Sequence, residues 1–145
     1  MNIAPESPSE ELLSLLAQCA LPIADISPTS PPQFFGVRSG GALVAVVGLE
    51  IHCPFGLLRS LAVLPSFRER GFARSLVSFA ESFAVSRGVD TLFLLTTTAE
   101  RFFLALGYQP AARSAAPEVI QATVQFAGLC PTSSAFLSRH VAAAG

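Results

Sequence analysis

Residues 57–75 read LLRSLAVLPSFRERGFARS, and this stretch decides the fold. The apolar run before Pro65 predicts a strand, and the turn around Gly71 leads into a helix. That helix presents apolar residues at helical spacing, namely Phe72, Leu76, Phe79 and Phe83, and it ends near Arg87 and Gly88. A strand that runs through a glycine turn into a helix aims unpaired backbone N–H groups at whatever lies before the helix. The sequence therefore predicts an anion site at this turn.

The turn has the composition that a pyrophosphate site needs. Gly71 allows a ligand to approach the backbone closely, and Ala73 keeps the first helical turn small. Three arginines, Arg68, Arg70 and Arg74, add positive charge around it. The alternative is a plain turn with a solvated arginine cluster that opens a surface helix, and the local sequence leaves both interpretations open.

The rest of the chain supplies a sheet around this unit. We expect a first helix that begins at Ser7-Pro8 and ends near Cys19, and then a loop over residues 23–33. Three strands joined by short turns follow between residues 33 and 65. The later elements are a strand at 91–98, helices at 99–106 and 117–127, and a last strand at 134–141. This order predicts an α/β (α+β) fold with one central sheet.

Length, charge and the absence of lysine exclude several fold and enzyme classes for this chain. A chain of 145 residues fits a single domain over residues 1–145, and 51% hydrophobic against 13% charged residues predicts a substantial core. The formal net charge of −1 gives no general attraction to nucleic acid or to a membrane surface. All nine basic residues are arginine, which excludes a lysine Schiff base and a P-loop lysine.

Location and metal binding are also constrained. The longest apolar run, residues 42–49, is too short to span a membrane, and no secretory signal is visible, so we expect a cytoplasmic protein. The three cysteines, Cys19, Cys53 and Cys130, form no metal-binding spacing. We expect them to be buried as small apolar side chains, with no metal cofactor.

Two motifs together resemble the GNAT superfamily of N-acetyltransferases. Arg68-x-x-Gly71-x-Ala73, after a strand ending in Val63-Leu64-Pro65, resembles the Q/R-x-x-G-x-G/A signature of that family. Residues 99–108 resemble the later helix, A-x-x-F-Y-x-x-x-G-F/Y. The resemblance implies a mixed central sheet in which an antiparallel N-terminal meander splays from the C-terminal half, with helices on both faces.

The resemblance also implies roles for the motif residues. The pyrophosphate of acetyl-CoA would lie on Gly71, Phe72, Ala73 and neighbouring residues, which are Arg68, Glu69, Arg70 and Arg74. The pantetheine arm would pair with the strand edge at Leu61, Ala62 and Val63. The backbone N–H of Val63 would donate to the thioester carbonyl.

Proton transfer is where the sequence departs from the family pattern. Glu50, a carboxylate late in an apolar strand, is the candidate base, and the alternative is a solvated strand-end residue. His52 beside it is expected in solvent. The tyrosine that serves as the acid in many family members is replaced by Phe103, so water or the Thr97 hydroxyl remains as proton source.

Arg59 bears on the acceptor. A guanidinium among leucines needs a partner, which is either Glu50 or an anionic group of the substrate. Residues 48–50, 57–63, 95–100 and 129–131 resemble a subgroup described as arsenic-resistance N-acetyltransferases, which suggests an amino-acid-like acceptor with an arsinate or phosphinate group. Spacing alone does not support an arsenic-binding thiol site at Cys53 and Cys130.

The sequence therefore predicts acetyl transfer from acetyl-CoA to the primary amine of a small molecule. The alternative is a CoA-binding or regulatory module that lacks turnover, which the missing tyrosine favours. The many phenylalanines and the low charge suggest a homodimer.

Overall fold

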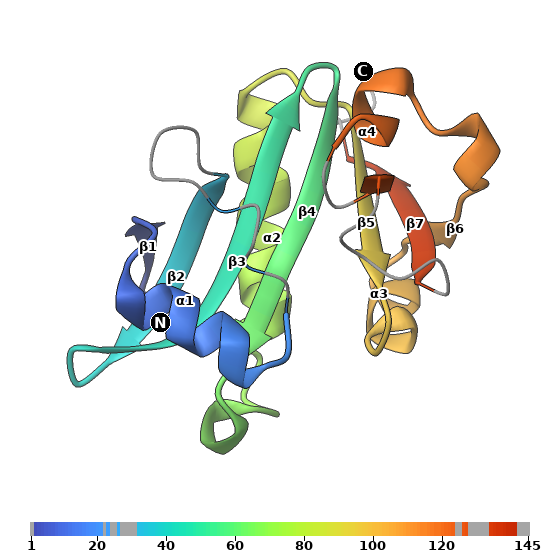
Figure 1. Cartoon of the computed structure of the whole chain (residues 1–145). Coiled ribbons are helices and arrows are strands. Elements are labelled where there is room, and N and C mark those ends of the chain that lie inside the picture. The colour runs from blue at the N-terminus through green and yellow to red at the C-terminus, as the bar shows by residue number, and fades with distance from the viewer. Residues whose placement is uncertain are drawn as a thin grey trace. The chain divides into compact units, whose positions relative to one another are not determined.

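The computed structural model describes residues 2–21, 23, 26, 32–123, 126–127 and 134–141. Seven strands form one sheet in the order β1-β2-β3-β4-β5-β7-β6 (Figure 1). They are β1 (Ile3–Glu6), β2 (Gln33–Ser39), β3 (Ala42–His52), β4 (Phe55–Val63), β5 (Thr91–Thr96), β6 (Gln109–Pro110) and β7 (Ala135–His140). β4 and β5 are parallel, whereas β1–β2, β2–β3, β5–β7 and β6–β7 are antiparallel. The predicted mixed sheet is confirmed.

Four α-helices and two short 3-10 turns accompany the sheet in the described part of the chain. They are α1 (Glu10–Gln18), η1 (Pro65–Phe67), α2 (Phe72–Ser86), α3 (Glu100–Ala105), η2 (Arg113–Ala115) and α4 (Glu118–Gln121). No helix among the described residues is long and apolar enough to cross a membrane.

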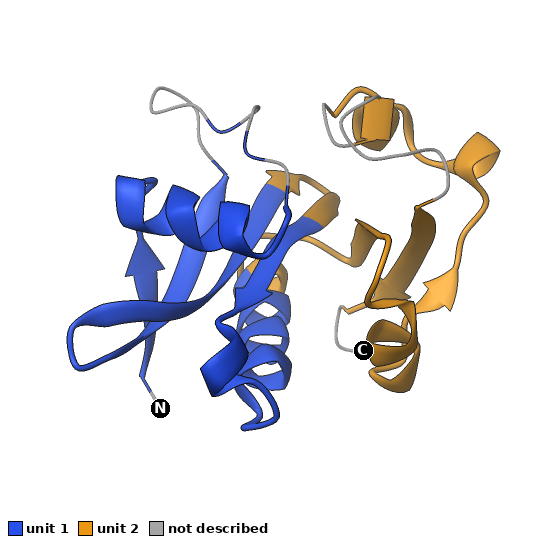
Figure 2. Cartoon of the chain, turned by 60° about the horizontal axis from the view of Figure 1, so that its bottom comes forward, with its two compact units in different colours: residues 1–50, 58–83 blue, residues 51–57, 84–145 orange. Residues whose placement is uncertain are grey.

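The chain divides into two compact units, coloured separately in Figure 2. Unit 1 comprises residues 1–50 and 58–83, and unit 2 comprises residues 51–57 and 84–145. Unit 1 therefore holds most of β4 with the loop and helix that follow it. Unit 2 holds β5, β6 and β7.

Unit 1 has helices on both faces of its strands, because successive side chains of a strand point to opposite sides. Phe34 packs with Leu12, Leu15 and Leu16 of α1 in one buried cluster. The next residue, Phe35, instead contacts Phe79 and Phe83 of α2, with ring centroids 5.0 and 4.9 Å apart. Figure 1 shows α1 on one side of β2–β4 and α2 on the other.

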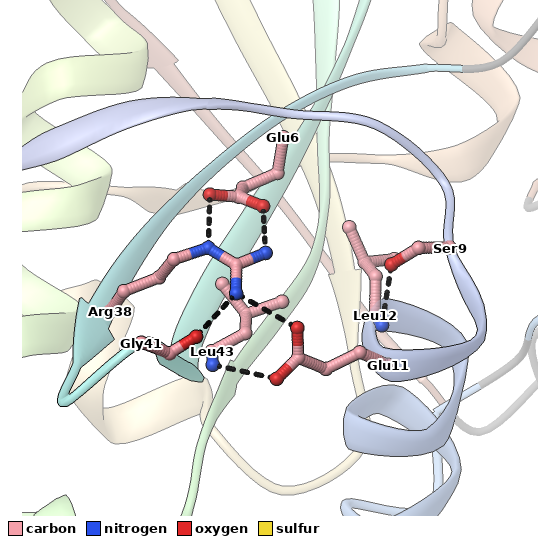
Figure 3. A network of polar contacts seen from close by, with 7 residues as sticks. All are labelled: Glu6, Ser9, Glu11, Leu12, Arg38, Gly41 and Leu43. Atoms are coloured by element: carbon pink, nitrogen blue, oxygen red, sulfur yellow. Dashed lines mark hydrogen bonds and ion pairs between the residues drawn. The ribbon is translucent and has the colours of Figure 1, made fainter.

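An arginine ties the N-terminal strand to the β2–β3 hairpin (Figure 3). Arg38 binds Glu6 in a bidentate pair at 3.1 and 2.7 Å, and its third nitrogen reaches Glu11 at 2.9 Å. The Leu43 N–H donates to the other Glu11 oxygen at 3.0 Å. That backbone bond, followed by the bond from Arg38, holds the pKa of Glu11 below its ordinary value.

Unit 2 is built on aromatic contacts. Phe93 of β5 stacks on Phe136 of β7 with a centroid distance of 5.4 Å, and both rings pack with Leu57, Ala116 and Ile120. Phe103 of α3 lies edge-on to Tyr108 at 5.4 Å. Tyr108 is buried, as its place in the motif predicts.

Several expectations need correction. β1 was not predicted, and α1 is capped by Ser9 rather than Ser7, because the Leu12 N–H donates to Ser9 Oγ at 3.2 Å. The helix expected at 117–127 is not continuous: residues 126–127 are helical, with the Ala127 N–H donating to the Thr123 carbonyl at 2.9 Å, but α4 ends at Gln121. Its end has a local cause: the Thr123 hydroxyl donates to the Ile120 carbonyl at 2.7 Å and accepts from the Phe126 N–H at 3.3 Å. A threonine side chain that satisfies backbone groups competes with helix propagation.

Candidate functional site

The predicted strand–turn–helix unit is present within unit 1. β4 ends at Val63, the 3-10 turn η1 follows at once, and α2 begins at Phe72. The loop between η1 and α2 consists of residues 68–71, which are the residues that the sequence assigned to an anion.

Gly71 is the N-cap of α2. Its carbonyl accepts from the Ser75 N–H at 3.1 Å, and its φ of +82° lies in the left-handed region that glycine tolerates best. A Cβ built on Gly71 would have no heavy atom within 4 Å, so the space before the helix is open. A helix of 15 residues thus presents its first N–H groups at an open loop.

Glu69 adds a strained position to this loop. Its φ of +64° is left-handed although it is not glycine, which costs roughly 1–2 kcal/mol. Glu69 and Gly71 are both left-handed and one residue apart. Turns of this kind gather successive backbone N–H groups into anion-binding concavities, and such strain concentrates at functional sites.

The three arginines of the loop region, Arg68, Arg70 and Arg74, have no ion-pair partner among the described residues. The Arg70 guanidinium lies 5.0 Å from the centre of the Phe67 ring, and the Arg74 side chain starts from the first turn of α2. By contrast, Arg38 and Arg59 both form ion pairs. Positive charge at the start of α2 is therefore available for an anion.

Arg68 has a different environment. Its Nε donates to the Val63 carbonyl at 2.9 Å, and one terminal nitrogen lies 3.8 Å from Cys19 Sγ. The Cys19 thiol itself lies 3.8 Å from the same Val63 oxygen. The structure thus brings Val63 and Arg68 together with Cys19, the C-cap residue of α1.

The partner of Arg59 is Glu50. Arg59 Nη1 lies 3.0 Å from Glu50 Oε2, and the two side chains are 1% and 17% exposed. This confirms the first of the two predicted partners. Gly48 makes room for the contact, because a Cβ there would lie 3.1 Å from Arg59 Cγ.

The next residue marks an irregularity of β4. Ser60 has a φ of +56°, and its Oγ accepts from Arg59 Nε at 3.1 Å. His52 is half-buried rather than fully exposed.

Unit 2 holds the remaining predicted residues. Thr97 is exposed in the bend after β5, and Phe103 is buried in α3. The neighbouring Thr96 is occupied with the backbone, because its Oγ1 accepts from the Ala99 N–H at 2.9 Å. A hydroxyl at Thr97 is thus open to solvent.

The prediction of buried cysteines is wrong for Cys53, which is exposed in the β3–β4 turn, and Cys19 is half-buried. Cys53 lies at a turn where the Arg87 carbonyl is its polar partner, with Sγ 3.0 Å from that oxygen. Cys130 lies outside the described residues. Within the part of the chain that is described, no group of three His, Cys, Asp or Glu residues has metal-binding geometry.

Two residues that contact the site, Cys19 and Gly48, were not predicted from the sequence. Cys19 lies 44 residues before Val63 in the chain, and no spacing pattern links them. Gly48 carried a usable signal, because a glycine inside an apolar strand often marks a close approach.

The comparisons with known proteins agree with this geometry. Residues 4–108 match the Acetyltransferase (GNAT) family, which is more than half of the chain. An uncharacterized N-acetyltransferase of Chlorobaculum tepidum is 40% identical over 63 residues, which are 43% of this chain and 40% of that protein. The chain thus matches about two fifths of the length of this curated relative.

Solved structures share the fold. N-acetylglutamate synthase from Neisseria gonorrhoeae, solved with coenzyme A and N-acetyl-glutamate, matches with a TM-score of 0.79 at 19% identity, over 99% of this chain and 36% of that one. An acetyltransferase of the GNAT family from Staphylococcus aureus matches with a TM-score of 0.72 at 15% identity, over 97% and 99% of the two chains. The sequence motif, the fold and the family match agree, and the chain belongs to the GNAT acetyltransferase family.

Proposed function

We propose that this protein transfers an acetyl group from acetyl-CoA to the primary amine of a small molecule. One observation supports this most strongly: the open, glycine-capped start of α2 at the family signature, where Arg70 and Arg74 form no ion pair with any described residue. A dianionic pyrophosphate matches that combination of N–H groups and positive charge.

The residues present fit acetyl-CoA at this loop. The first N–H groups of α2, from Phe72 and Ala73 on, face the open space before Gly71 and can donate to phosphate oxygens. Arg70 and Arg74 supply charge from either side of the glycine. Glu69 contributes through its left-handed backbone, and its carboxylate is the one unfavourable charge in the loop.

The strand before the loop offers the second contact. The Leu64 N–H donates to the Val44 carbonyl of β3 at 2.9 Å, so Leu64 faces β3. In a strand, the N–H and C=O of one residue point to the same side and alternate between neighbours, so those of Val63 point to the opposite edge. That edge, from Leu61 to Val63, is where we place the pantetheine arm, with the Val63 N–H directed at the thioester carbonyl.

Acetyl-CoA supplies an activated acyl group, and the chain orients it and stabilises the negative charge that develops on its carbonyl oxygen. Orientation of two bound reactants alone can lower the barrier by about 7 to 11 kcal/mol. A fixed backbone N–H at the carbonyl oxygen adds electrostatic stabilisation as negative charge develops there. The amine attacks the thioester carbonyl carbon, the carbon–sulfur bond breaks, and the thiolate leaves with the electron pair.

Proton transfer requires one group that accepts the proton of the amine and one that donates a proton to the thiolate. Glu50 is our candidate acceptor for the ammonium proton, directly or through water, and it holds this position through its ion pair with Arg59. Phe103 cannot donate a proton, so the thiolate of CoA takes its proton from water or from a hydroxyl such as Thr97.

For the acceptor, we propose an amino-acid-like amine, and compounds of the arsinate or phosphinate type are the first to try. Arg59 is 1% exposed and forms an ion pair with Glu50. We therefore assign it no direct contact with the anionic group of the acceptor.

The proposed function is tested with purified protein, acetyl-CoA and a panel of amines that includes phosphinothricin, arsinothricin and ordinary amino acids. Release of free CoA that depends on the amine supports the proposal. Tight acetyl-CoA binding without release for any amine would instead favour a non-catalytic CoA-binding module.

A further inference from the structure

One arginine of the signature is turned toward the protein rather than toward a ligand. Arg68 Nε carries a single hydrogen, and it is directed at the Val63 carbonyl over 2.9 Å. The Cys19 thiol approaches the same oxygen at 3.8 Å and the Arg68 guanidinium at 3.8 Å. The C-cap of α1, the end of β4 and the loop therefore converge on one carbonyl group.

That carbonyl belongs to a peptide unit held from both sides. The Leu64 N–H, in the same peptide, donates to Val44 of β3 at 2.9 Å, and the Val63 oxygen on the opposite side accepts from Arg68. The two bonds fix the orientation of the Val63–Leu64 peptide plane. The Val63 N–H belongs to the preceding Ala62–Val63 peptide, and in extended backbone it points to the same strand edge as the Val63 carbonyl. Holding the Val63–Leu64 plane restricts rotation at the Val63 Cα that joins the two peptides.

We propose that Arg68 is a positioning residue: it clamps the Val63–Leu64 peptide and so restricts rotation at Val63, which keeps the adjacent Val63 N–H aimed at the thioester carbonyl before the substrate binds. This inference rests on the proposed function. Its physical benefit is preorganisation, because a donor that is already oriented needs no rearrangement as charge develops on the carbonyl oxygen.

The clamp separates two kinds of arginine in one loop. Neither arginine has an ion pair among the described residues, but the Arg70 guanidinium lies over the Phe67 ring and donates to no described backbone oxygen, which suits a phosphate contact. Arg68 donates its Nε hydrogen to a backbone oxygen. That hydrogen bond needs a donor at the position of Nε, but it does not need a positive charge. Neutral substitutions therefore distinguish the two roles.

The test compares Arg68→Gln with Arg68→Met. The glutamine amide nitrogen lies the same number of bonds from Cα as arginine Nε, so Gln keeps a donor without the charge. Methionine has a similar length and provides no donor. Arg70→Gln is the matched control, because it makes the same substitution two positions further along the same loop.

We expect kcat of Arg68→Met to fall about tenfold below that of Arg68→Gln, as the loss of one well-placed hydrogen bond predicts. The Kd for CoA should agree between these two variants within about twofold, because neither carries the charge. Arg70→Gln should weaken CoA binding more than Arg68→Gln does. Equal kcat values for the Gln and Met variants, or a loss of CoA affinity in Arg68→Gln as large as in Arg70→Gln, would overturn the proposal.

A second readout needs no turnover. Amide hydrogen exchange of Leu64 in the CoA-free protein should be faster in Arg68→Met than in Arg68→Gln, because the clamp holds the same peptide. Equal exchange rates would refute the clamp. If the wild-type protein shows no acetyl transfer, the proposed function fails while this measurement still decides the clamp. If Arg68→Met does not fold, the comparison of Arg68→Gln with Arg70→Gln for CoA affinity decides it.

Discussion

The ion pair between Glu50 and Arg59 predicts an asymmetry in stability. Arg59 is 1% exposed and Glu50 is 17% exposed, so the two partners differ in their access to water once the other is removed. Glu50→Gln removes the carboxylate that faces this buried guanidinium, which costs about 3 kcal/mol, at the low end for a buried pair because Glu50 is partly exposed. Arg59→Met leaves a carboxylate that can turn toward solvent, and we expect a loss of about 1 kcal/mol.

Thermal and urea unfolding measure both values. For a chain of this size each kcal/mol shifts Tm by about 2 to 4 °C, so Glu50→Gln should lower Tm by about 6 to 12 °C. The double variant Glu50→Gln with Arg59→Met should be more stable than Glu50→Gln alone, because it removes the buried positive charge together with its carboxylate. Equal losses for the two single variants, or a larger loss for Arg59→Met, would show that the buried guanidinium is not the costly partner.

Further predictions concern the loop and the N-terminal segment. Gly71→Glu should abolish CoA binding in calorimetry while the circular dichroism spectrum keeps its helical signal, because the side chain enters the space before α2 and its charge repels phosphate. Since the φ of +82° strains any side chain at this position, Gly71→Ala is the control for strain alone, and unchanged affinity in Gly71→Glu would displace the anion site. Ser9→Ala should cost about 1 kcal/mol in urea unfolding through loss of the α1 N-cap, and a loss below the measurement error would contradict the cap. Because the pKa of Glu11 is lowered on folding, its contribution to stability is present above its ordinary pKa and lost as the pH falls through its folded pKa; Glu11→Gln should flatten the acid limb of a plot of stability against pH, and an unchanged limb would refute this.

The sequence predicted the parts of the fold that local patterns determine. The helix from Phe72 to Ser86 was readable from its apolar spacing and its Arg87-Gly88 end, and the strand before it from its apolar run. β1 was missed because a four-residue strand containing Pro5 has little local signal; it exists through pairing with β2 at the edge of the sheet.

In the candidate site, too, local sequence predicted some features, and others depend on tertiary packing. The motif indicated the loop at Gly71, and the cost of burying a guanidinium indicated a partner for Arg59, which is Glu50. The contact of Cys19 with Val63 depends on how α1 packs, and the separate environments of Arg68 and Arg70 depend on side-chain directions that a motif does not encode.

The stoichiometry of acetyl transfer distinguishes an N-acetyltransferase from a protein that only binds or hydrolyses acetyl-CoA. Purified protein is incubated with acetyl-CoA and an amine, and free CoA and acetylated amine are quantified together by mass spectrometry, with Gly71→Glu as the inactive control. We expect both products to form in equal amounts, only with amine present and only with the wild-type loop. Free CoA that appears at the same rate without amine, or acetylation that persists in Gly71→Glu, would contradict this expectation.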